Sequence, residues 1–230
     1  QQGLAKVFVH AITDGRDSPP KSAMNSIKPL EEKMKQLGVG KIATVLGRYY
    51  AMDRDRRWER VEKAYVCLTK GSNYIADTAE RAVQSAYDNN LTDEFIEPTN
   101  IVGSGQAPTL IKEGDAVVYF NYRIDRPREL TKAFVLDNFQ ADANKTSQLD
   151  SSSFNPPFQR GDKIQNRLFV TMTEYEQRLP VEIAFAPNVV INPLGKVLSD
   201  QNIKQLRMAE TEKERFVGFY FNGRQQEIFP

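Results

Sequence analysis

The sequence has one histidine and one cysteine among its 230 residues. With only His10 and Cys67 as nitrogen and sulfur ligands, the chain does not form a zinc or di-metal site of the usual histidine-rich kind, and we assign it no metal ligand. Magnesium bound by carboxylates alone stays open. Cys67 has no disulfide partner within the chain, which suits a reducing compartment. The apolar residues around it indicate that it packs as a small core residue.

An excess of charge of one sign is also missing. Lys and Arg number 31 and Asp and Glu 30, so no overall basic field favours nucleic acid or an anionic membrane as a partner. The sequence has neither an apolar run of about 18 residues nor a charged leader followed by an apolar core. We therefore expect a soluble, cytoplasmic protein that binds neither nucleic acid nor membrane.

What is present is a globular composition, 40% hydrophobic and 27% charged, for which we expect one domain over residues 1–230. Predicted strands alternate with predicted helices, which favours an α/β fold with a mainly parallel central sheet and helices on both faces. The expected strands are 6–12, 41–46, 116–120, 168–173 and 216–221. The expected helices are 22–37, 54–68, 78–87, 129–136 and 192–198.

The stretch 115–130, DAVVYFNYRIDRPREL, is the part of the sequence from which we interpret the other motifs. Residues 116–120 are apolar and β-prone, which predicts a strand buried on both faces. Arg123, Arg126 and Arg128 follow at its carboxyl end, where α/β sheets bind ligands and where guanidinium groups bind carboxylate or phosphate in pairs of hydrogen bonds. We predict an anion site, with a solvated polar helix face as the alternative.

Two more strand ends carry charge. Arg16 and Asp17 follow the first strand in the turn DGRD, and Arg48 and Arg54 follow the second. Because parallel strands end at one edge, these residues are expected to share a crevice with the arginines after 116–120. Five guanidinium groups suit a small polyanion, and Asp17 is the candidate to take a proton from its hydroxyl. Taken alone, DGRD is also typical of a turn held by Asx-type bonds.

Local signals predict where helices begin and end. Gly38 is expected to end the first helix. Pro29 is awkward inside it, so the helix either begins near Lys28 or bends there. Asp77, with Glu80 three residues on, predicts a capping box, and Asn192 before Pro193 predicts a helix start.

Two further features of the sequence give expectations of their own. The polar, Ser- and Asn-rich segment 138–161 is expected to be an exposed loop. His10 ends the first strand just before DGRD, so either a structural hydrogen bond or a role in the pocket is possible for it.

Five motifs resemble the cofactor-independent (2,3-bisphosphoglycerate-independent) phosphoglycerate mutases, in the right order along the chain: DGRD-x-PPKSA, GRYYAMDRD-x-RWERV-x-KAY, FNYR-x-DR-x-REL, LFVTMTEY and LRMAETEK. The resemblance is to the substrate-binding, or phosphotransferase, domain that is inserted into a phosphatase-like domain. It implies that 2-phosphoglycerate and 3-phosphoglycerate are the ligands, and that the whole enzyme is a monomeric glycolytic isomerase.

The resemblance also implies residue roles. Asp17 is the general base or acid on the glycerate hydroxyl. The substrate contacts are Arg16, Asp17, Arg48, Arg54, Arg123, Arg126 and Lys213, the last from the motif ETEK. The sequence departs from the family at Glu214 and Phe216, where a tyrosine and a histidine are usual after the lysine.

The family's nucleophilic serine and its metal ligands match nothing in this chain. The resemblance places a phosphoserine intermediate and two divalent ions, manganese or else magnesium or cobalt, on a metal-binding domain outside residues 1–230. The chain alone is then expected to be inactive, and clear mutase turnover with added manganese would refute that. The alternative is a free-standing binding or regulatory module for a small phosphorylated acid, in which case the native product has a mass near 26 kDa rather than about twice that.

Overall fold

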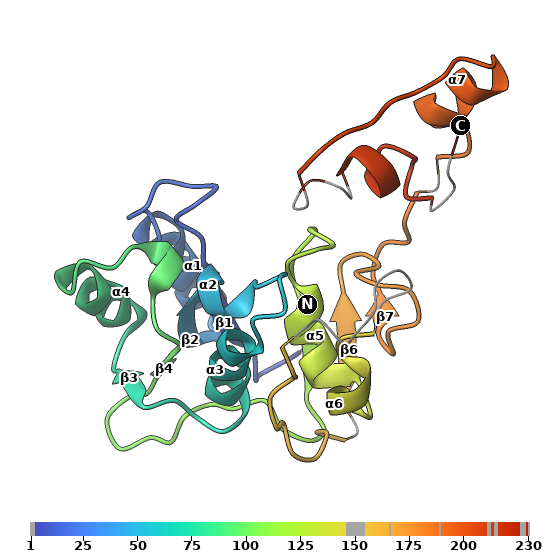
Figure 1. Cartoon of the computed structure of the whole chain (residues 1–230). Coiled ribbons are helices and arrows are strands. Elements are labelled where there is room, and N and C mark those ends of the chain that lie inside the picture. The colour runs from blue at the N-terminus through green and yellow to red at the C-terminus, as the bar shows by residue number, and fades with distance from the viewer. Residues whose placement is uncertain are drawn as a thin grey trace. The chain divides into compact units, whose positions relative to one another are not determined.

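A computed structural model describes residues 3–145, 155–165, 167–188, 190–210, 213, 216–225 and 229. By its internal contacts the chain divides into two units, Gln1–Phe185 and Ala186–Pro230, each of which is described by itself (Figure 1). The expectation of one domain over residues 1–230 stays a prediction.

The first sheet has the strand order β1-β2-β4-β3. Its strands are β1 (Phe8–Thr13), β2 (Lys41–Gly47), β4 (Thr99–Ile101) and β3 (Tyr74–Ala76). β1 and β2 pair in parallel, as do β3 and β4, whereas β2 and β4 are antiparallel. Because Thr13 lies opposite Gly47, the chain leaves β1 and β2 side by side at one edge.

Helices cover both faces of this sheet. α1 (Met24–Leu37) and α4 (Ala79–Asp88) pack with Val45 of β2 in one apolar cluster. α3 (Trp58–Thr69) packs with Leu46 in another. Neighbouring residues of a strand point to opposite faces, so the two clusters lie on opposite sides of β2. The short α2 (Arg48–Ala51) and a 3₁₀ turn, η1 (Asp93–Phe95), lie at the carboxyl edge.

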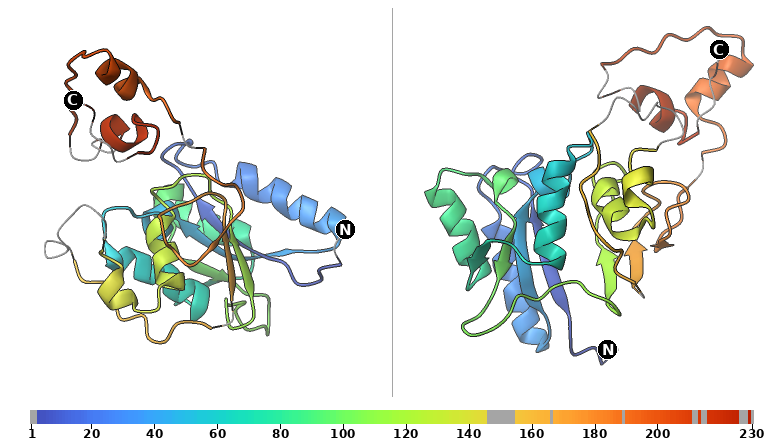
Figure 2. Two further views of the ribbon diagram at one scale, coloured as in Figure 1. Left: turned by 90° about the vertical axis from the view of Figure 1, so that its right-hand side faces the viewer. Right: turned by 60° about the horizontal axis from the view of Figure 1, so that its bottom comes forward.

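The second sheet is parallel throughout, with the order β5-β6-β7. It comprises β5 (Ala116–Tyr119), β6 (Leu168–Thr171) and β7 (Glu182–Ile183). α5 (Arg128–Val135) and α6 (Phe139–Asp142) follow β5, and α3 lies between the first sheet and α5 (Figure 1 and Figure 2). These elements confirm the predicted α/β class with mostly parallel strands.

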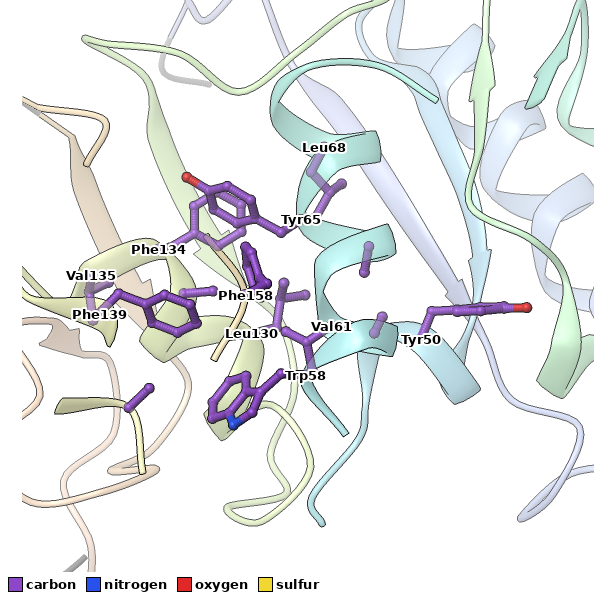
Figure 3. Packing of buried hydrophobic residues seen from close by; sticks show 14 of the residues in the cluster. Tyr50, Trp58, Val61, Tyr65, Leu68, Leu130, Phe134, Val135, Phe139 and Phe158 are labelled. Atoms are coloured by element: carbon purple, nitrogen blue, oxygen red, sulfur yellow. The ribbon is translucent and has the colours of Figure 1, made fainter. Parts of the chain in front are cut away.

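The core of this unit joins the two sheets through α3 and α5. Figure 3 shows Trp58, Val61 and Leu68 of α3 facing Leu130 and Phe134 of α5. The face of α3 that packs against α5 is buried, since Trp58 and Val61 are each only 1% exposed. Burial of such side chains contributes about 1.5–3 kcal/mol each, so this packing holds α5 and the loop before it against the first sheet.

Two burial expectations were wrong. β5 is not buried on both faces, because Val118 and Phe120 are 58% and 78% exposed while Val117 and Tyr119 pack against the core. Segment 138–161 is not simply an exposed loop, because Phe139 and Phe158 enter the core. The aromatic rings anchor a segment whose polar composition predicts exposure. Residues 146–154 of that segment lie outside the described residues.

At the helix starts, one of the two alternatives for the first helix and one predicted cap were wrong. α1 begins at Met24 with Pro29 inside it, so it does not begin near Lys28. α4 is capped by Thr78, whose side chain accepts the Arg81 N–H at 3.1 Å, and not by Asp77. The stop at Gly38 is confirmed by its left-handed φ of 67°.

The second unit contains α7 (Leu194–Asp200) and a π-type helix, η4 (Phe216–Tyr220), among its described residues. The predicted strand 216–221 was therefore wrong. A strand needs a neighbour for its backbone, and none of the described residues after 186 forms one. Instead Phe221 N–H donates to Phe216 O at 3.2 Å and Asn222 N–H donates to Gly218 O at 2.9 Å at the end of this helix. Asn192 does not cap α7, whose N-cap is Pro193.

None of the described helices has both the length and the apolar composition needed to cross a bilayer.

Candidate anion-binding site

The site begins in the DGRD turn after β1. Asp14 Oδ1 accepts the backbone N–H groups of Arg16 at 3.3 Å and Asp17 at 3.2 Å, so the expected Asx-type turn is present. Gly15 has φ 68°, and a Cβ there would lie 2.8 Å from Asp93 Cβ and Glu94 N. Only glycine fits this close turn without strain. The turn leaves the Asp17 side chain 59% exposed at the sheet edge.

Arg48, the first residue of α2, lies beside this turn because β1 and β2 end together. Its side chain is 3% exposed, pairs with Asp14 and donates to Asp17 Oδ2 at 2.8 Å. The hydrogen bond and charge of Arg48 lower the pKa of Asp17. Burial acts to raise the pKa of Asp14, but the hydrogen bond and charge of Arg48, together with the backbone N–H groups of Asp17 and Arg16, outweigh it, so that pKa is lowered as well.

The loop after β5 supplies the other arginines. Arg123 Nη1 lies 3.0 Å from Asp17 Oδ2, and its Nε lies 3.2 Å from Asp125 Oδ1. Arg54 Nη1 reaches the other oxygen of Asp125 at 2.9 Å. Burial acts to raise the pKa of Asp125, but hydrogen bonds from Arg123 and Arg54 bring it down to about 2. Asp17 and Asp125 therefore act as counter-ions that bridge arginines from distant parts of the sequence.

Arg126 completes the group. Its Nη1 donates to Met52 O at 3.1 Å. Burial lowers the pKa of Arg126, and the charges of Arg54, Arg48 and Arg123 lower it further, which places all these guanidinium groups near one another. Arg126 Nε and Arg48 Nη2 are buried and have no hydrogen-bond partner among the described residues. Buried donors without acceptors are costly, and an anion is the ligand that would satisfy them.

The structure thus brings together Arg48, Arg54, Arg123, Arg126 and Asp17, while their roles in binding stay predictions. Arg16 is 55% exposed and its guanidinium lies 3.8 Å from Glu94 rather than on Asp17. Lys213 belongs to the second unit, where its N–H donates to Glu210 O at 2.8 Å and its Nζ lies 5.6 Å from the Phe216 ring centre. The expected departure at Glu214 lies outside the described residues.

His10 is occupied elsewhere. Its Nδ1 lies 2.9 Å from Thr44 Oγ1 on the neighbouring strand. Burial lowers the pKa of His10 to about 4, so the ring is neutral at physiological pH. This contact corresponds to the structural alternative of the two that the sequence left open.

Sequence reasoning missed the carboxylates that organise the arginines, Asp14 and Asp125, and a buried pair behind them, Asp53 and Glu129. Asp125 stands inside the motif R-x-D-R, between two arginines singled out for binding. Guanidinium groups crowded together need counter-ions in the absence of a ligand, and that requirement is the signal that points to Asp125.

The metal ions implied by the resemblance do not fit the residues present. The described part of the chain contains no cluster of three or more histidine, cysteine, aspartate or glutamate side chains suited to a metal ion. A cavity of about 480 Å³ is lined by side chains that include Asp137, Arg160 and Lys163, and by none of the arginines of the candidate site.

The fold and the candidate site define a mixed α/β protein whose arginines and carboxylates cluster where strands end and helices begin. Comparison with known proteins supplies the family. Residues 1–177 match the family model described as BPG-independent PGAM N-terminus. The chain belongs to the 2,3-bisphosphoglycerate-independent phosphoglycerate mutase family.

Relatives agree across the whole chain. It is 44% identical over 230 residues to the 2,3-bisphosphoglycerate-independent phosphoglycerate mutase of Moorella thermoacetica, covering 100% of this chain and 42% of the relative. For the enzyme of Clostridium novyi the identity is 46%, covering 99% and 41%. A solved structure described as Leishmania mexicana phosphoglycerate mutase at low cobalt concentration matches with a TM-score of 0.74 and 26% identity, covering 99% of this chain and 40% of that one. The chain thus spans about two fifths of the length of these relatives.

Proposed function

We propose that this chain is the phosphoglycerate-binding part of a 2,3-bisphosphoglycerate-independent phosphoglycerate mutase. One observation carries the proposal: guanidinium groups that follow β2 and β5 gather around Asp17, which follows β1, and Asp125, and two of their buried donors have no described partner. A three-carbon acid with a carboxylate and a phosphate offers enough acceptor oxygens for such a group.

In the absence of a ligand, Asp17 and Asp125 neutralise part of the positive charge. An incoming polyanion competes with them for Arg123, which is 40% exposed and bonds to both carboxylates. The unpartnered donors of Arg48 and Arg126 face no such competition. Binding of the polyanion therefore gives hydrogen bonds to the buried donors of Arg48 and Arg126. It also replaces a carboxylate of the protein by the ligand as the counter-ion of Arg123.

Asp17 is the proposed base. Arg48 lowers its pKa, which keeps the carboxylate ionised and able to accept a proton. When substrate oxygens take over Arg123, Asp17 loses one cation, which raises its pKa and makes it a stronger base toward the glycerate hydroxyl. That hydroxyl oxygen then accepts the phosphoryl group, and the proton held on Asp17 passes in the next cycle to the glycerate oxygen from which the phosphoryl group departs.

The remaining chemistry is proposed for residues outside this chain. A serine of a phosphatase-like domain of the same polypeptide would carry the phosphoryl group between the 2- and 3-oxygens of glycerate. Two divalent ions bound there, with manganese the first candidate, would neutralise the phosphoryl oxygens together with Lys213. The whole protein would be a cytoplasmic, monomeric enzyme of glycolysis that binds no nucleic acid.

Binding of 3-phosphoglycerate tests the proposal. For the Arg123→Ala variant we expect about 10- to 100-fold weaker binding by titration calorimetry, since hydrogen bonds to charged groups contribute about 1.5–3 kcal/mol. Arg81→Ala is the matched control, because Arg81 is 75% exposed and pairs only with Asp77 among the interactions described for it. Equal affinity of Arg123→Ala and the wild type, or no binding by the wild type, would contradict the proposal.

A further inference from the structure

Behind the arginines lie two carboxyl groups that no step above uses. Glu129, in the first turn of α5, is 5% exposed, and Asp53, between α2 and α3, is 3% exposed. Glu129 Oε1 accepts the Arg56 N–H at 2.8 Å. Asp53 Oδ2 accepts the N–H groups of Asp55 at 2.9 Å and Arg57 at 3.0 Å.

These two carboxyl groups require a proton between them. Glu129 Oε2 is buried and has no donor among the described residues, and the two carboxyl groups lie close together because they accept the N–H groups of three successive residues, Asp55, Arg56 and Arg57. Two ionised carboxylates only accept hydrogen bonds, so the contact forms when one of them is protonated. Burial and the neighbouring charge of Asp53 raise the pKa of Glu129 to about 8, which makes Glu129 the protonated partner.

The contact joins the two segments that carry the arginines. Arg54 follows Asp53 directly, and the preceding Met52 O accepts the Arg126 guanidinium at 3.1 Å. Arg126 stands three residues before Glu129, at the entrance to α5. Within segment 52–57, Arg56 has φ 57°, a left-handed conformation that costs a side-chain-bearing residue free energy unless surrounding contacts hold it. The bond to Glu129 is one such contact.

We propose that Glu129 is a positioning residue: its protonated carboxyl group braces segment 52–57 against α5 and so holds Arg54 in place beside Arg126 and Arg123. This inference rests on the proposed function for its substrate, 3-phosphoglycerate, but the brace itself depends only on Glu129, Asp53 and Arg56. Ionisation of Glu129 places two negative charges together in a buried site, and the brace opens.

The charged groups around the pair fix the direction of the pH effect. On the side of α3, Arg57 Nη1 and Arg60 Nη1 lie 3.4 and 3.7 Å from Asp53 Oδ1. Arg56 lowers the pKa of Glu129 only in part. On α5, Lys132 and Arg128 are engaged by Glu176 at 2.9 and 3.4 Å. A rise in pH through the pKa of Glu129 therefore removes the shared proton and weakens anion binding.

The test uses the longest natural polypeptide that contains this chain, with affinity for 3-phosphoglycerate measured at about pH 7 and about pH 9. If the ionised form does not bind, the wild-type affinity falls about 10-fold between these values. Glu129→Gln keeps the acceptor for Arg56 and supplies a permanent N–H donor for Asp53, so it should bind equally at both. Glu129→Ala should bind weakly at both, and Glu59→Gln, an exposed control on α3, should follow the wild type.

Amide hydrogen exchange of residues 52–57 gives a readout that needs no substrate. After correction for intrinsic rates, exchange should be faster at the higher pH in the wild type, unchanged in Glu129→Gln and fast at both in Glu129→Ala. A wild type that binds no phosphoglycerate would overturn the proposed function, while exchange would still decide on the brace. If amide exchange in the wild type does not depend on pH, or if Glu129→Gln behaves as Glu129→Ala does, the proposed role of Glu129 as a brace is wrong.

Discussion

Two buried arginine environments in the first unit differ in how fully their donors are satisfied. Arg160 is 3% exposed, and its guanidinium donates to Ala133 O at 3.1 Å, Leu136 O at 2.6 Å and Asp137 O at 3.1 Å. These carbonyls belong to the end of α5, where helix carbonyls lack partners within the helix. At the strand ends, by contrast, Arg48 and Arg126 each keep one buried donor with no described partner.

The difference separates a structural cation from one prepared for a ligand. A guanidinium whose donors all meet backbone carbonyls has no capacity left for an anion. An unpartnered donor alone is not enough, however, because Arg167 Nε is also buried without a described partner while its guanidinium lies 5.1 Å from the Phe134 ring centre. The candidate site combines unpartnered donors, neighbouring guanidinium groups and carboxylate counter-ions, of which Asp17 is exposed.

The largest expected effect concerns the satisfied arginine. Arg160→Ala leaves several carbonyls at the buried end of α5 without donors, so we expect the free energy of unfolding to fall by about 3 kcal/mol. Urea denaturation measures it, with Lys145→Ala, whose side chain is 68% exposed, as the control. Phosphoglycerate affinity of the folded variant should stay at the wild-type value. If Arg160→Ala instead lost affinity with little loss of stability, Arg160 would not differ from the arginines of the candidate site.

Arg126→Ala is expected to show the opposite pattern. Its removal takes away an unpartnered buried donor and the repulsion among neighbouring guanidinium groups, so stability should change by less than about 1 kcal/mol. Affinity for 3-phosphoglycerate should fall about 100-fold, since a charged hydrogen-bond donor to the ligand is lost. Parallel calorimetry and urea denaturation on Arg126→Ala and Arg160→Ala provide the check. Should Arg126→Ala unfold as readily as Arg160→Ala, Arg126 would be a structural residue.

Much of this arrangement is predictable from the sequence. Apolar β-prone runs that end in DGRD, GRYY and R-x-D-R give three strand ends with charge, because the pattern is local and the parallel rule brings such ends to one edge. The register of Thr13 against Gly47 agrees with this for the first two. The position of β5 in a separate sheet is not local, since it depends on how α3 and α5 pack.

Other features depend on contacts between distant residues. Glu129 has the sequence context of an ordinary first-turn acid, and only folding places it against Asp53 and the Arg56 N–H. The run 216–221 has the composition of a strand, but the described residues around it offer no neighbouring strand and it closes into a helical turn. Local pattern predicts which residues are candidates, and tertiary contacts decide which of them share a counter-ion.

The smallest effect concerns the counter-ion of the candidate site. The pKa of Asp125 is about 2 in the folded chain, below its ordinary value. Its contribution to stability, about 2 kcal/mol at most, is therefore present above about pH 4 and lost as the pH falls toward 2. Asp125→Asn lacks this contribution at every pH. The free energy of unfolding of the wild type should therefore fall toward that of the variant as the solution is acidified. Urea denaturation between about pH 5 and pH 2 measures the difference, with the exposed Asp88→Asn as the control.

Because Asp125→Asn also removes the carboxylate that Arg54 and Arg123 share, added phosphate should stabilise this variant more than the wild type at neutral pH. Equal stabilisation of the two proteins would mean that Asp125 holds the arginines for the fold and does not stand in for a bound anion.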